Sequence, residues 1–439
     1  MQENYLMNTP SIKLNCRQAV GKLSIIGSEG PVQDGNVRVT LQKHAFHFGC
    51  NAFGWNKTNR LRHTHAQSGA SDGDQLESDV MRIRRRIKKH AEAYDLRTRG
   101  DDWEYVQRFL ELFNFAVVPF YENAVQPNSD TFRLHRASQI AAWAKHNGMT
   151  VKGHPLLFHH KGWLPDWMLQ LNEQEYWETM EQRYKTLLEH FGHKLAYWDF
   201  INEPMGHPTP APNVSESVCR AHELARRYTN CHGLTLNFSQ TEVARAPWHP
   251  QTFKMIDEIL DRGVRPDVLG VQAHLGRITE QGWDQFCSTI EKFKSYGLPI
   301  HITESTLSSG NDLPQELSEQ KQAQDLEKFY TYLFAQPLVK AVIWWDLTDR
   351  HSFCLIGGLL RHDLSPKPAF QSLRRLVYET WHTDETMKII NGQASFTGYT
   401  GRYDACIELP NGLSLLRSFD LNPQDDQVIE LDIRPAHTL

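Results

Sequence analysis

In the middle of the chain, short apolar runs alternate with longer amphipathic stretches. The apolar runs have the length of strands buried on both faces, and the stretches between them have the periodicity of helices that cover a sheet. Strands are predicted at Phe48–Phe53, Phe115–Tyr121, Thr150–Phe158, Ala196–Glu203, Leu234–Ser239, Val268–Leu275, Pro299–Ser305 and Val339–Asp346. Helices are predicted between them, for example at Arg133–His146, Glu173–His190, Glu216–Thr229 and Gln315–Phe334. This alternation predicts an α/β fold, namely a TIM (β/α)8 barrel.

The two ends of the chain have a different pattern. Around Lys22–Ile26 and Val37–Leu41, apolar and polar residues alternate as in strands with one buried face. A similar alternation, with glycine turns, returns near the C-terminal end. The predicted organisation is therefore a small N-terminal β element (residues 1–45), the barrel (46–382) and a small C-terminal β element (383–439).

A polar insertion at about residues 57–94 separates the first two predicted barrel strands. It contains a basic run, Arg82–His90, which would suit an anionic partner or a solvated helix that neutralises nearby acidic side chains. The second interpretation is favoured because Asp72, Asp74 and Glu77 lie just before the run.

Composition and charge narrow the classes of partner. The formal net charge of −5 gives no reason to expect a nucleic acid or an anionic membrane. The seven cysteines are scattered singly, without a zinc-like spacing, so no metal and no cofactor is predicted. Residues 1–20 lack the apolar segment of a secretory signal, so a cytoplasmic protein is expected, or a secreted one if a leader has been removed. The sequence indicates no oligomeric state.

Two of the predicted strands end on a carboxylate, Glu203 in one and Glu304 in the other. An acid at the tip of an otherwise buried strand suits a strand that opens into a site, and the sites of TIM barrels lie at the C-terminal ends of the strands. A retaining glycosidase needs two such acids, one as proton donor and one as nucleophile. The pair therefore predicts a carbohydrate as the substrate.

Several ordered motifs between residues 46 and 380 strengthen this interpretation. They are Glu122-Asn123, Gly153–His159, Trp198–Glu203, Gly270–His274, Ile302–Glu304, Trp345–Asp349 and Ser365–Ala369. In this order they resemble glycoside hydrolase family 10, whose best-known members are endo-β-1,4-xylanases. The resemblance implies an O-glycosyl hydrolase that cleaves β-glycosidic bonds in xylan-type plant polysaccharide, or in oligosaccharides derived from it, by double displacement.

The resemblance also implies roles for individual residues. Glu203 would be the general acid and then the base, and Glu304 the nucleophile. The pKa of Glu203 is expected to be raised by the apolar neighbours Trp198 and Pro204 and by the adjacent carboxylate. Asn202 would hydrogen-bond the sugar 2-hydroxyl, and His274 would hydrogen-bond Glu304. The remaining expected sugar-binding residues are Glu122, Asn123, His154, Gln272 and Trp345. Trp344, the neighbour of Trp345, is expected to face the core.

The chain departs from the family pattern at several positions. Thr306 stands where the family has an aspartate, so His274 is expected to be neutral. Gln126 replaces a lysine and Phe158 a tryptophan, and both changes remove polar groups for a long sugar chain. We therefore expect modest activity on polymeric xylan compared with small β-glycosides.

Two other interpretations remain open. One is a related β-glycosidase or transglycosylase with a different sugar specificity. The other is an inactive carbohydrate-binding barrel, against which the presence of both glutamates, Asn202 and His274 argues.

Overall fold

The computed structural model describes residues 14–55, 100–229, 233–244, 248–310, 312–354, 356–423 and 427–434. The predicted polar insertion at about 57–94, with its basic run, lies outside these residues. The chain divides into two compact units. We call Phe48–Leu326 with Leu338–Gln371 the barrel unit, and Met1–His47, Glu327–Pro337 and Ser372–Leu439 the β unit.

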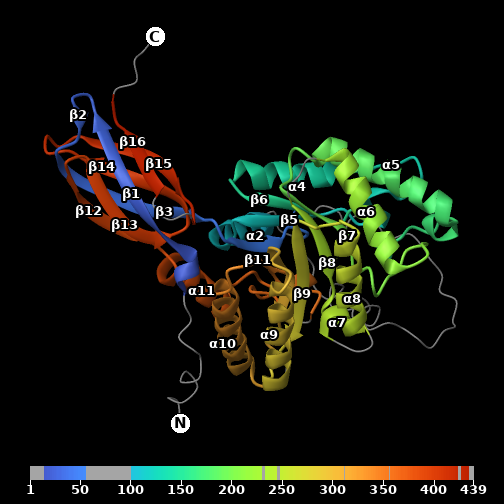
Figure 1. Cartoon of the computed structure of the whole chain (residues 1–439). Coiled ribbons are helices and arrows are strands. Elements are labelled where there is room, and N and C mark those ends of the chain that lie inside the picture. Colours follow the sequence, from blue (N-terminus) through green and yellow to red (C-terminus); the bar gives the residue numbers. More distant parts are fainter. Residues whose placement is uncertain are drawn as a thin grey trace. The chain divides into compact units, whose positions relative to one another are not determined.

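The sheet of the barrel unit is a closed barrel of parallel strands, as predicted (Figure 1). Around the barrel the neighbours follow the order β10-β11-β4-β5-β6-β7-β8-β9. The strands are β4 (His47–Asn51), β5 (Phe115–Pro119), β6 (Thr150–His154), β7 (Tyr197–Asn202), β8 (Leu234–Phe238), β9 (Val268–Gly276), β10 (Ile300–Leu307) and β11 (Val339–Trp344). The apolar runs thus form a TIM barrel because each strand is covered on both faces.

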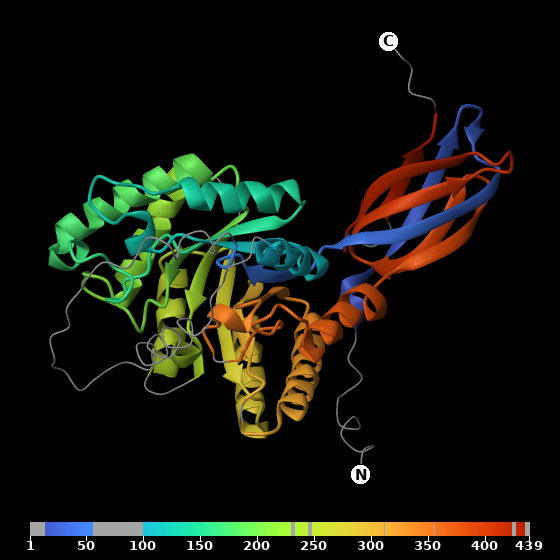
Figure 2. The same cartoon turned by 180° about the vertical axis from the view of Figure 1, so that it is seen from behind.

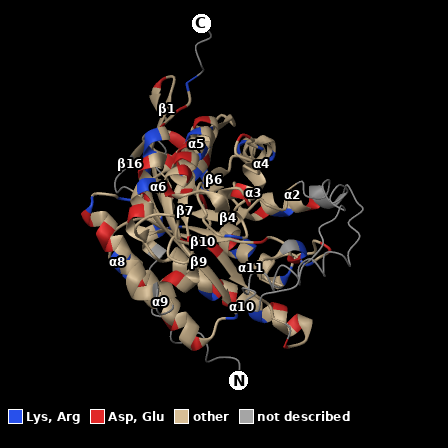
Figure 3. Cartoon of the chain, turned by 90° about the vertical axis from the view of Figure 1, so that its right-hand side faces the viewer, with Lys and Arg blue, Asp and Glu red and all other residues tan. Residues whose placement is uncertain are grey.

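Helices alternate with these strands. The longer ones are α2 (Gly100–Leu112), α4 (His135–His146), α5 (Glu173–Phe191), α6 (Val214–Tyr228), α8 (Trp248–Asp261), α9 (Glu280–Lys294), α10 (Gln315–Phe334) and α11 (Pro368–Arg375). Two short helices, α3 (Glu122–Val125) and α7 (Gln240–Ala244), follow strands directly. Local sequence sets the helix starts: Asn172 and Glu175 form a capping box at the start of α5. Acidic and basic residues are interspersed along the outer helices (Figure 3).

The inside of the barrel is filled by large side chains near the N-terminal ends of the strands. The rings of Phe115, Tyr197 and His301 pack on one another with centroid separations of 4.8–6.3 Å. Next to them, Val117 and Ile343 are almost fully buried. The packed floor leaves the opposite, C-terminal strand ends free to carry a site.

The β unit is an antiparallel sheet with one parallel pair, and it joins strands from both ends of the chain (Figure 2). Its strand order is β15-β14-β3-β12-β13-β1-β16, with β2 beside β1. The strands are β1 (Gln18–Gly27), β2 (Gly30–Pro31), β3 (Asp34–His44), β12 (Asp384–Ile390), β13 (Gln393–Tyr399), β14 (Gly401–Glu408), β15 (Ser414–Leu421) and β16 (Gln427–Asp432). Alternate residues of β3 and β14 are buried, which explains the period-two pattern in the sequence.

Two further expectations concern membranes and cysteines. Of the helices that the structure describes, none is long and apolar enough to cross a membrane. In the described ranges, Cys50, Cys219, Cys354 and Cys406 are free thiols.

Candidate active site

The two glutamates sit at the C-terminal ends of β7 and β10. Glu304 lies within β10, and its side chain is only 7 % exposed. Glu203 directly follows β7, and its side chain is 20 % exposed. The φ angle of Glu203 is 50°, which is the left-handed region that residues with a side chain rarely adopt. Such backbone strain concentrates at functional sites, because the surrounding structure must hold it.

Asn237 at the end of β8 connects the two sides of the site. Its side-chain amide donates to Asn202 Oδ1 (2.6 Å) and to Glu304 Oε1 (3.3 Å). Its side-chain oxygen Oδ1 accepts from the Thr303 hydroxyl. A side chain at Gly270 would lie 2.7 Å from Asn237 Oδ1, so this motif glycine makes room for the connecting amide. The sequence analysis did not nominate Asn237, although a polar residue at the end of an apolar strand was a usable signal.

A buried chain of polar groups on β6 and β7 leads to Glu304. The Lys152 ammonium lies 2.6 Å from Asp199 Oδ1, and both side chains are 1 % exposed. Asp199 Oδ2 lies 2.7 Å from His154 Nδ1, so that ring nitrogen carries a proton and donates it. His154 Nε2 then faces the Tyr121 hydroxyl at 3.1 Å and Glu304 Oε1 at 3.7 Å. Asp199 therefore fixes which edge of His154 points to the nucleophile.

His274 on β9 approaches the other oxygen of the nucleophile. Its Nε2 lies 3.4 Å from Glu304 Oε2, and its Nδ1 lies 3.0 Å from the Thr306 hydroxyl. Burial lowers the pKa of His274, but hydrogen bonds to Cys354 and Glu304 more than offset this and raise the pKa to about 10. The prediction of a neutral His274 is therefore wrong. Thr306 brings no charge but accepts the ring proton, and the groups that raise the pKa of His274 are Cys354 and then Glu304.

Glu203 is held through both carboxylate oxygens. Its Oε1 accepts from Gln272 Nε2 (2.8 Å) on β9 and lies 3.4 Å from Asn202 Nδ2. Its Oε2 lies 3.5 Å from His207 Nε2. Burial raises the pKa of Glu203, but the hydrogen bonds to His207 and Gln272 outweigh it, and the net pKa is lowered.

The expected increase in the pKa of Glu203 is therefore wrong for the substrate-free protein. That expectation counted Trp198 as an apolar neighbour of the carboxyl group. The Trp198 ring instead packs against Phe120 (4.8 Å) and Phe191 (6.4 Å), the latter on α5. A side chain at Gly153 would lie 2.3 Å from this ring, which explains the glycine of that motif.

Glu242 on α7 is a third carboxyl group of the site, and it contacts the turn that follows Glu203. It is 1 % exposed, and its oxygens accept the backbone N–H groups of Gly206 (2.7 Å) and Ser239 (2.8 Å). Burial and then the negative charge of Glu203 raise the pKa of Glu242 to about 8. The sequence analysis missed this residue because an isolated glutamate on a short helix resembles a solvated one.

Glu122 and Asn123, predicted together as sugar ligands, face different surroundings. Glu122 is 0 % exposed, accepts the Phe158 N–H (2.7 Å) and lies 3.9 Å from Arg183. Burial raises the pKa of Glu122. This placement differs from a direct sugar-binding role, because a carboxylate without exposed surface contacts only protein atoms. Asn123 is exposed, and its backbone N–H donates to the Trp163 carbonyl (2.8 Å).

Aromatic rings line the site beside the nucleophile. Trp345 packs edge-on against His154 and Phe53, each at 5.3 Å. Tyr121 stacks on Trp163 at 4.1 Å. Trp344, by contrast, is fully buried, and its indole N–H donates to a backbone carbonyl, so the two consecutive tryptophans occupy different environments as expected.

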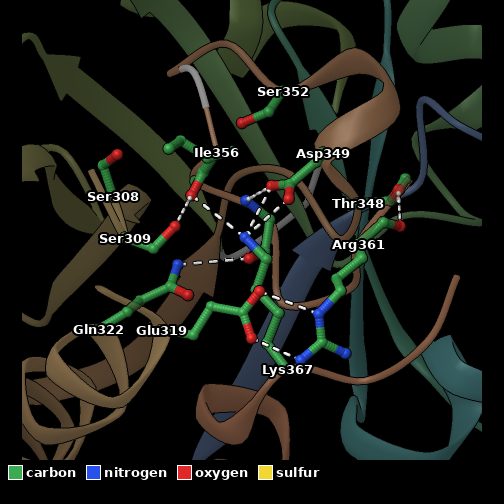
Figure 4. A network of polar contacts seen from close by, with 12 residues as sticks. Ser308, Ser309, Glu319, Gln322, Thr348, Asp349, Ser352, Ile356, Arg361 and Lys367 are labelled. Carbon is green, nitrogen blue, oxygen red and sulfur yellow. Dashed lines mark hydrogen bonds and ion pairs between the residues drawn. The ribbon is translucent and has the colours of Figure 1, made fainter. Parts of the chain in front are cut away.

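The loop after β11 is fixed by a buried polar network (Figure 4). Asp349 accepts from the Gly358 N–H (2.9 Å) and from the Lys367 ammonium (2.9 Å), and the side chains of Asp349 and Lys367 are nearly inaccessible. Gln322 on α10 donates to the Leu307 carbonyl at the end of β10 (2.7 Å). Because the unpaired charge of either partner would be costly in the interior, this network holds the loop in one conformation beside the nucleophile.

The geometry suits acid–base and nucleophilic chemistry by two carboxylates. Glu203, Glu304, Asn202, His154, Gln272, His274 and Trp345 are brought together at one end of the barrel by the contacts above, whereas Glu122 is turned inward. In the described parts of the chain, no cluster of His, Cys, Asp and Glu is arranged to hold a metal ion.

Comparisons with known proteins agree with this geometry. Endo-1,4-beta-xylanase A of Caldicellulosiruptor saccharolyticus is 28% identical over 286 residues, which is 57% of this chain and 81% of that protein. Native xylanase 10B from Thermotoga maritima shares the fold, with a TM-score of 0.58 at 22% identity over 76% of this chain and 96% of that one. Xylanase 10B from Thermotoga petrophila, solved with xylobiose, has a TM-score of 0.55 at 22% identity, covering 70% and 99%.

The sequence model of glycosyl hydrolase family 10 matches residues 120–376, which is more than half of the chain. The matched range contains both glutamates and all the side chains that contact them in the site described above. The chain therefore belongs to glycosyl hydrolase family 10.

Proposed function

We propose that this chain hydrolyses β-glycosidic bonds in xylan-type plant polysaccharide, and preferentially in oligosaccharides derived from it, with retention of anomeric configuration. Glu304 is the nucleophile and Glu203 the acid and base. The observation that carries this proposal is the pair of glutamates at the C-terminal barrel end, each held by a separate set of donors and connected through Asn202 and Asn237.

The surroundings of Glu304 suit a nucleophile. Asn237 donates to one oxygen, and His274 contacts the other, so the carboxylate is held in one orientation. In the first step a Glu304 oxygen forms a bond to the anomeric carbon as the glycosidic C–O bond breaks. The leaving oxygen receives the proton of Glu203.

In the second step Glu203 takes a proton from water, and the hydroxide oxygen displaces Glu304 from the anomeric carbon. A lowered pKa in Glu203 favours the ionised form that this step requires. Asn202 and Gln272 lie beside Glu203 and can reach the sugar hydroxyls next to the cleaved bond. Asn123 and Trp345 are proposed to bind the rest of that sugar, and Glu122 to support them by holding the backbone of Phe158.

The preference for short substrates rests on two positions. Gln126 is 0 % exposed, and Phe158 is 5 % exposed and apolar, so neither side chain offers a polar group to a distant sugar. Each missing neutral hydrogen bond costs about 0.5–1.5 kcal/mol. Two such losses weaken the binding of a long chain by roughly tenfold, since about 1.4 kcal/mol is one decade.

A substrate panel tests the proposal. Aryl β-xylosides, aryl β-glucosides, xylo-oligosaccharides of increasing length and polymeric xylan would be compared by kcat/KM, with the product anomer followed by proton NMR. We expect β-configured xylose products, formed first as the β-anomer, and no gain in kcat/KM beyond short oligomers. An α-anomer as first product would refute the mechanism. A better rate on another sugar would favour a related specificity, and a steady rise up to polymer would refute the short-substrate preference.

A further inference from the structure

The turn that follows Glu203 brings a histidine back to its carboxylate. The His207 N–H donates to the Glu203 carbonyl (3.1 Å), so residues 203–207 form one turn of chain. This turn puts His207 Nε2 3.5 Å from Glu203 Oε2, while the other oxygen accepts from Gln272. The His207 side chain is 29 % exposed, so solvent protons can reach it.

The turn is anchored on both sides of His207. The N–H of Gly206, before it, donates to the buried Glu242 carboxyl group (2.7 Å). The carbonyl of Pro208, after it, accepts from His159 Nδ1 (2.7 Å). Because both flanking peptides are held, the ring of His207 is placed before any substrate arrives.

A second imidazole packs on the first. The His160 ring lies 4.3 Å from the His207 ring at 72°, and Phe158 contacts both. His160 Nδ1 accepts the Gly162 N–H (3.0 Å), so the proton of neutral His160 is on Nε2. Two cationic rings this close would repel each other. His207 Nε2 lies 3.5 Å from Glu203 Oε2, so a positive charge on this ring would lie directly beside that carboxylate.

The other ionisable groups around this pair come from four elements. They are His159 and His160 after β6, Glu242 on α7, Glu304 on β10 and Tyr121 before α3. Burial raises the pKa of Glu242 to about 8, so it is mostly uncharged at neutral pH. Burial lowers the pKa of His159.

We propose that His207 is a positioning residue for Glu203: it holds Oε2 and, as an imidazolium, favours the carboxylate form that accepts a proton from water. This inference rests on the proposed role of Glu203 as acid and base. The fall of kcat/KM at high pH, its alkaline limb, reports loss of the proton from Glu203 in the free enzyme. We expect this limb at lower pH with His207 than without it.

Two variants test the role by kinetics. His207→Gln keeps a hydrogen-bond donor without charge, and His207→Phe removes both. Nearby opposite charges shift a carboxyl pKa by about 1–3 units, so both variants should move the alkaline limb upward by about one pH unit or more on an aryl β-xyloside with a poor leaving group. His146→Gln, an exposed histidine at the end of α4, is the matched control and should leave the limb in place.

A second readout does not depend on turnover. In protein labelled with carbon-13 at glutamate carboxyl groups, the Glu203 resonance is assigned by its loss in Glu203→Gln and titrated without substrate. We expect two coupled steps in the unsubstituted chain and a single step at higher pH in His207→Gln. A single step in the unsubstituted chain, or a Glu203 titration that is unmoved in both variants, would overturn the proposal. If no glycoside in the panel is hydrolysed but the Glu203 titration is still shifted in the variants, the proposed function is refuted and this contact is not.

Discussion

The two glutamates of the site are held in contrasting ways. Glu304 lies inside a strand, and the groups that contact it come from the barrel strands β6, β8 and β9. Glu203 lies just past a strand in a left-handed conformation, and one of its two oxygens depends on a loop residue. The barrel strands thus hold Glu304, while we propose that the turn after β7 adjusts the ionisation of Glu203. Loops change more readily than strands, so the acid can be retuned without disturbing the nucleophile.

The largest effect is expected from removing the nucleophile. Glu304→Ala should lower kcat by about 10⁴-fold or more, because no covalent intermediate can form. Glu203→Ala should cost roughly 10²–10⁴-fold on glycosides with poor leaving groups but far less in the first step on activated aryl glycosides, which need little protonation. Steady-state and burst kinetics on both kinds of substrate would measure this. Equal losses of Glu203→Ala on the two kinds would remove Glu203 from the acid role.

The buried charges behind the nucleophile should matter for stability. Lys152→Met leaves Asp199 without its 2.6 Å partner in the barrel interior, and breaking such a pair costs about 3–5 kcal/mol. Urea unfolding followed by near-ultraviolet circular dichroism would measure the loss. Lys185→Met, at an exposed position of α5, is the control. Comparable stabilities of the two variants would show that Asp199 finds another partner.

A smaller effect is expected in how the stability of the folded protein depends on pH, through His274 beside Glu304. The pKa of His274 is raised in the folded protein to about 10, above the roughly 6.5 of an unfolded histidine. Its contribution to stability is therefore complete below about pH 6.5 and is lost as the pH rises toward 10. Urea midpoints across this window should fall less steeply in His274→Gln than in the unsubstituted chain. His146→Gln should keep the full slope, and parallel curves for all three proteins would contradict the charged state of His274.

The smallest effect is expected in the β unit. Arg38 on β3 forms a two-point ion pair with Asp384 on β12, but the side chains are 60% and 35% exposed. Exposed pairs of this kind are screened by water and salt. Arg38→Ala should leave the urea midpoint unchanged within error at 0.15 M salt. A clear loss would mean that this exposed pair fixes the strand register.

The barrel was predictable because its strands are continuous apolar runs. Each predicted strand appears in the structure with ends that differ by a few residues, since burial on both faces leaves a strong signal. The gathering of Glu203, Glu304 and His274 at one end followed from their positions at strand ends. Predicting that these three side chains meet required only the rule that the sites of parallel barrels lie at the C-terminal ends of the strands.

The remaining contacts depend on the directions of side chains, which the adjacent residues in the sequence do not determine. In the sequence Lys152 resembles an exposed lysine. Only the packing of β6 beside β7 brings its ammonium group to Asp199. Glu122 faces inward because Arg183 reaches it from α5, 61 positions away. His207 meets Glu203 because of a left-handed backbone at one residue. The ionisation errors have a related origin, because the pKa of Glu203 depends partly on His207 in the turn after β7 and that of His274 partly on Cys354 in the loop after β11.

The interleaved strands of the β unit constrain how the chain is made. β1 and β3 leave the ribosome early, but their partners β12 to β16 begin only at Asp384, 340 positions after His44. At roughly 5–20 residues per second, the early strands wait about 20–70 s for those partners. Throughout this interval their unpaired edges are exposed to other nascent chains, as unpaired strand edges generally are. Slow codons or a pause after the barrel would lengthen that exposure.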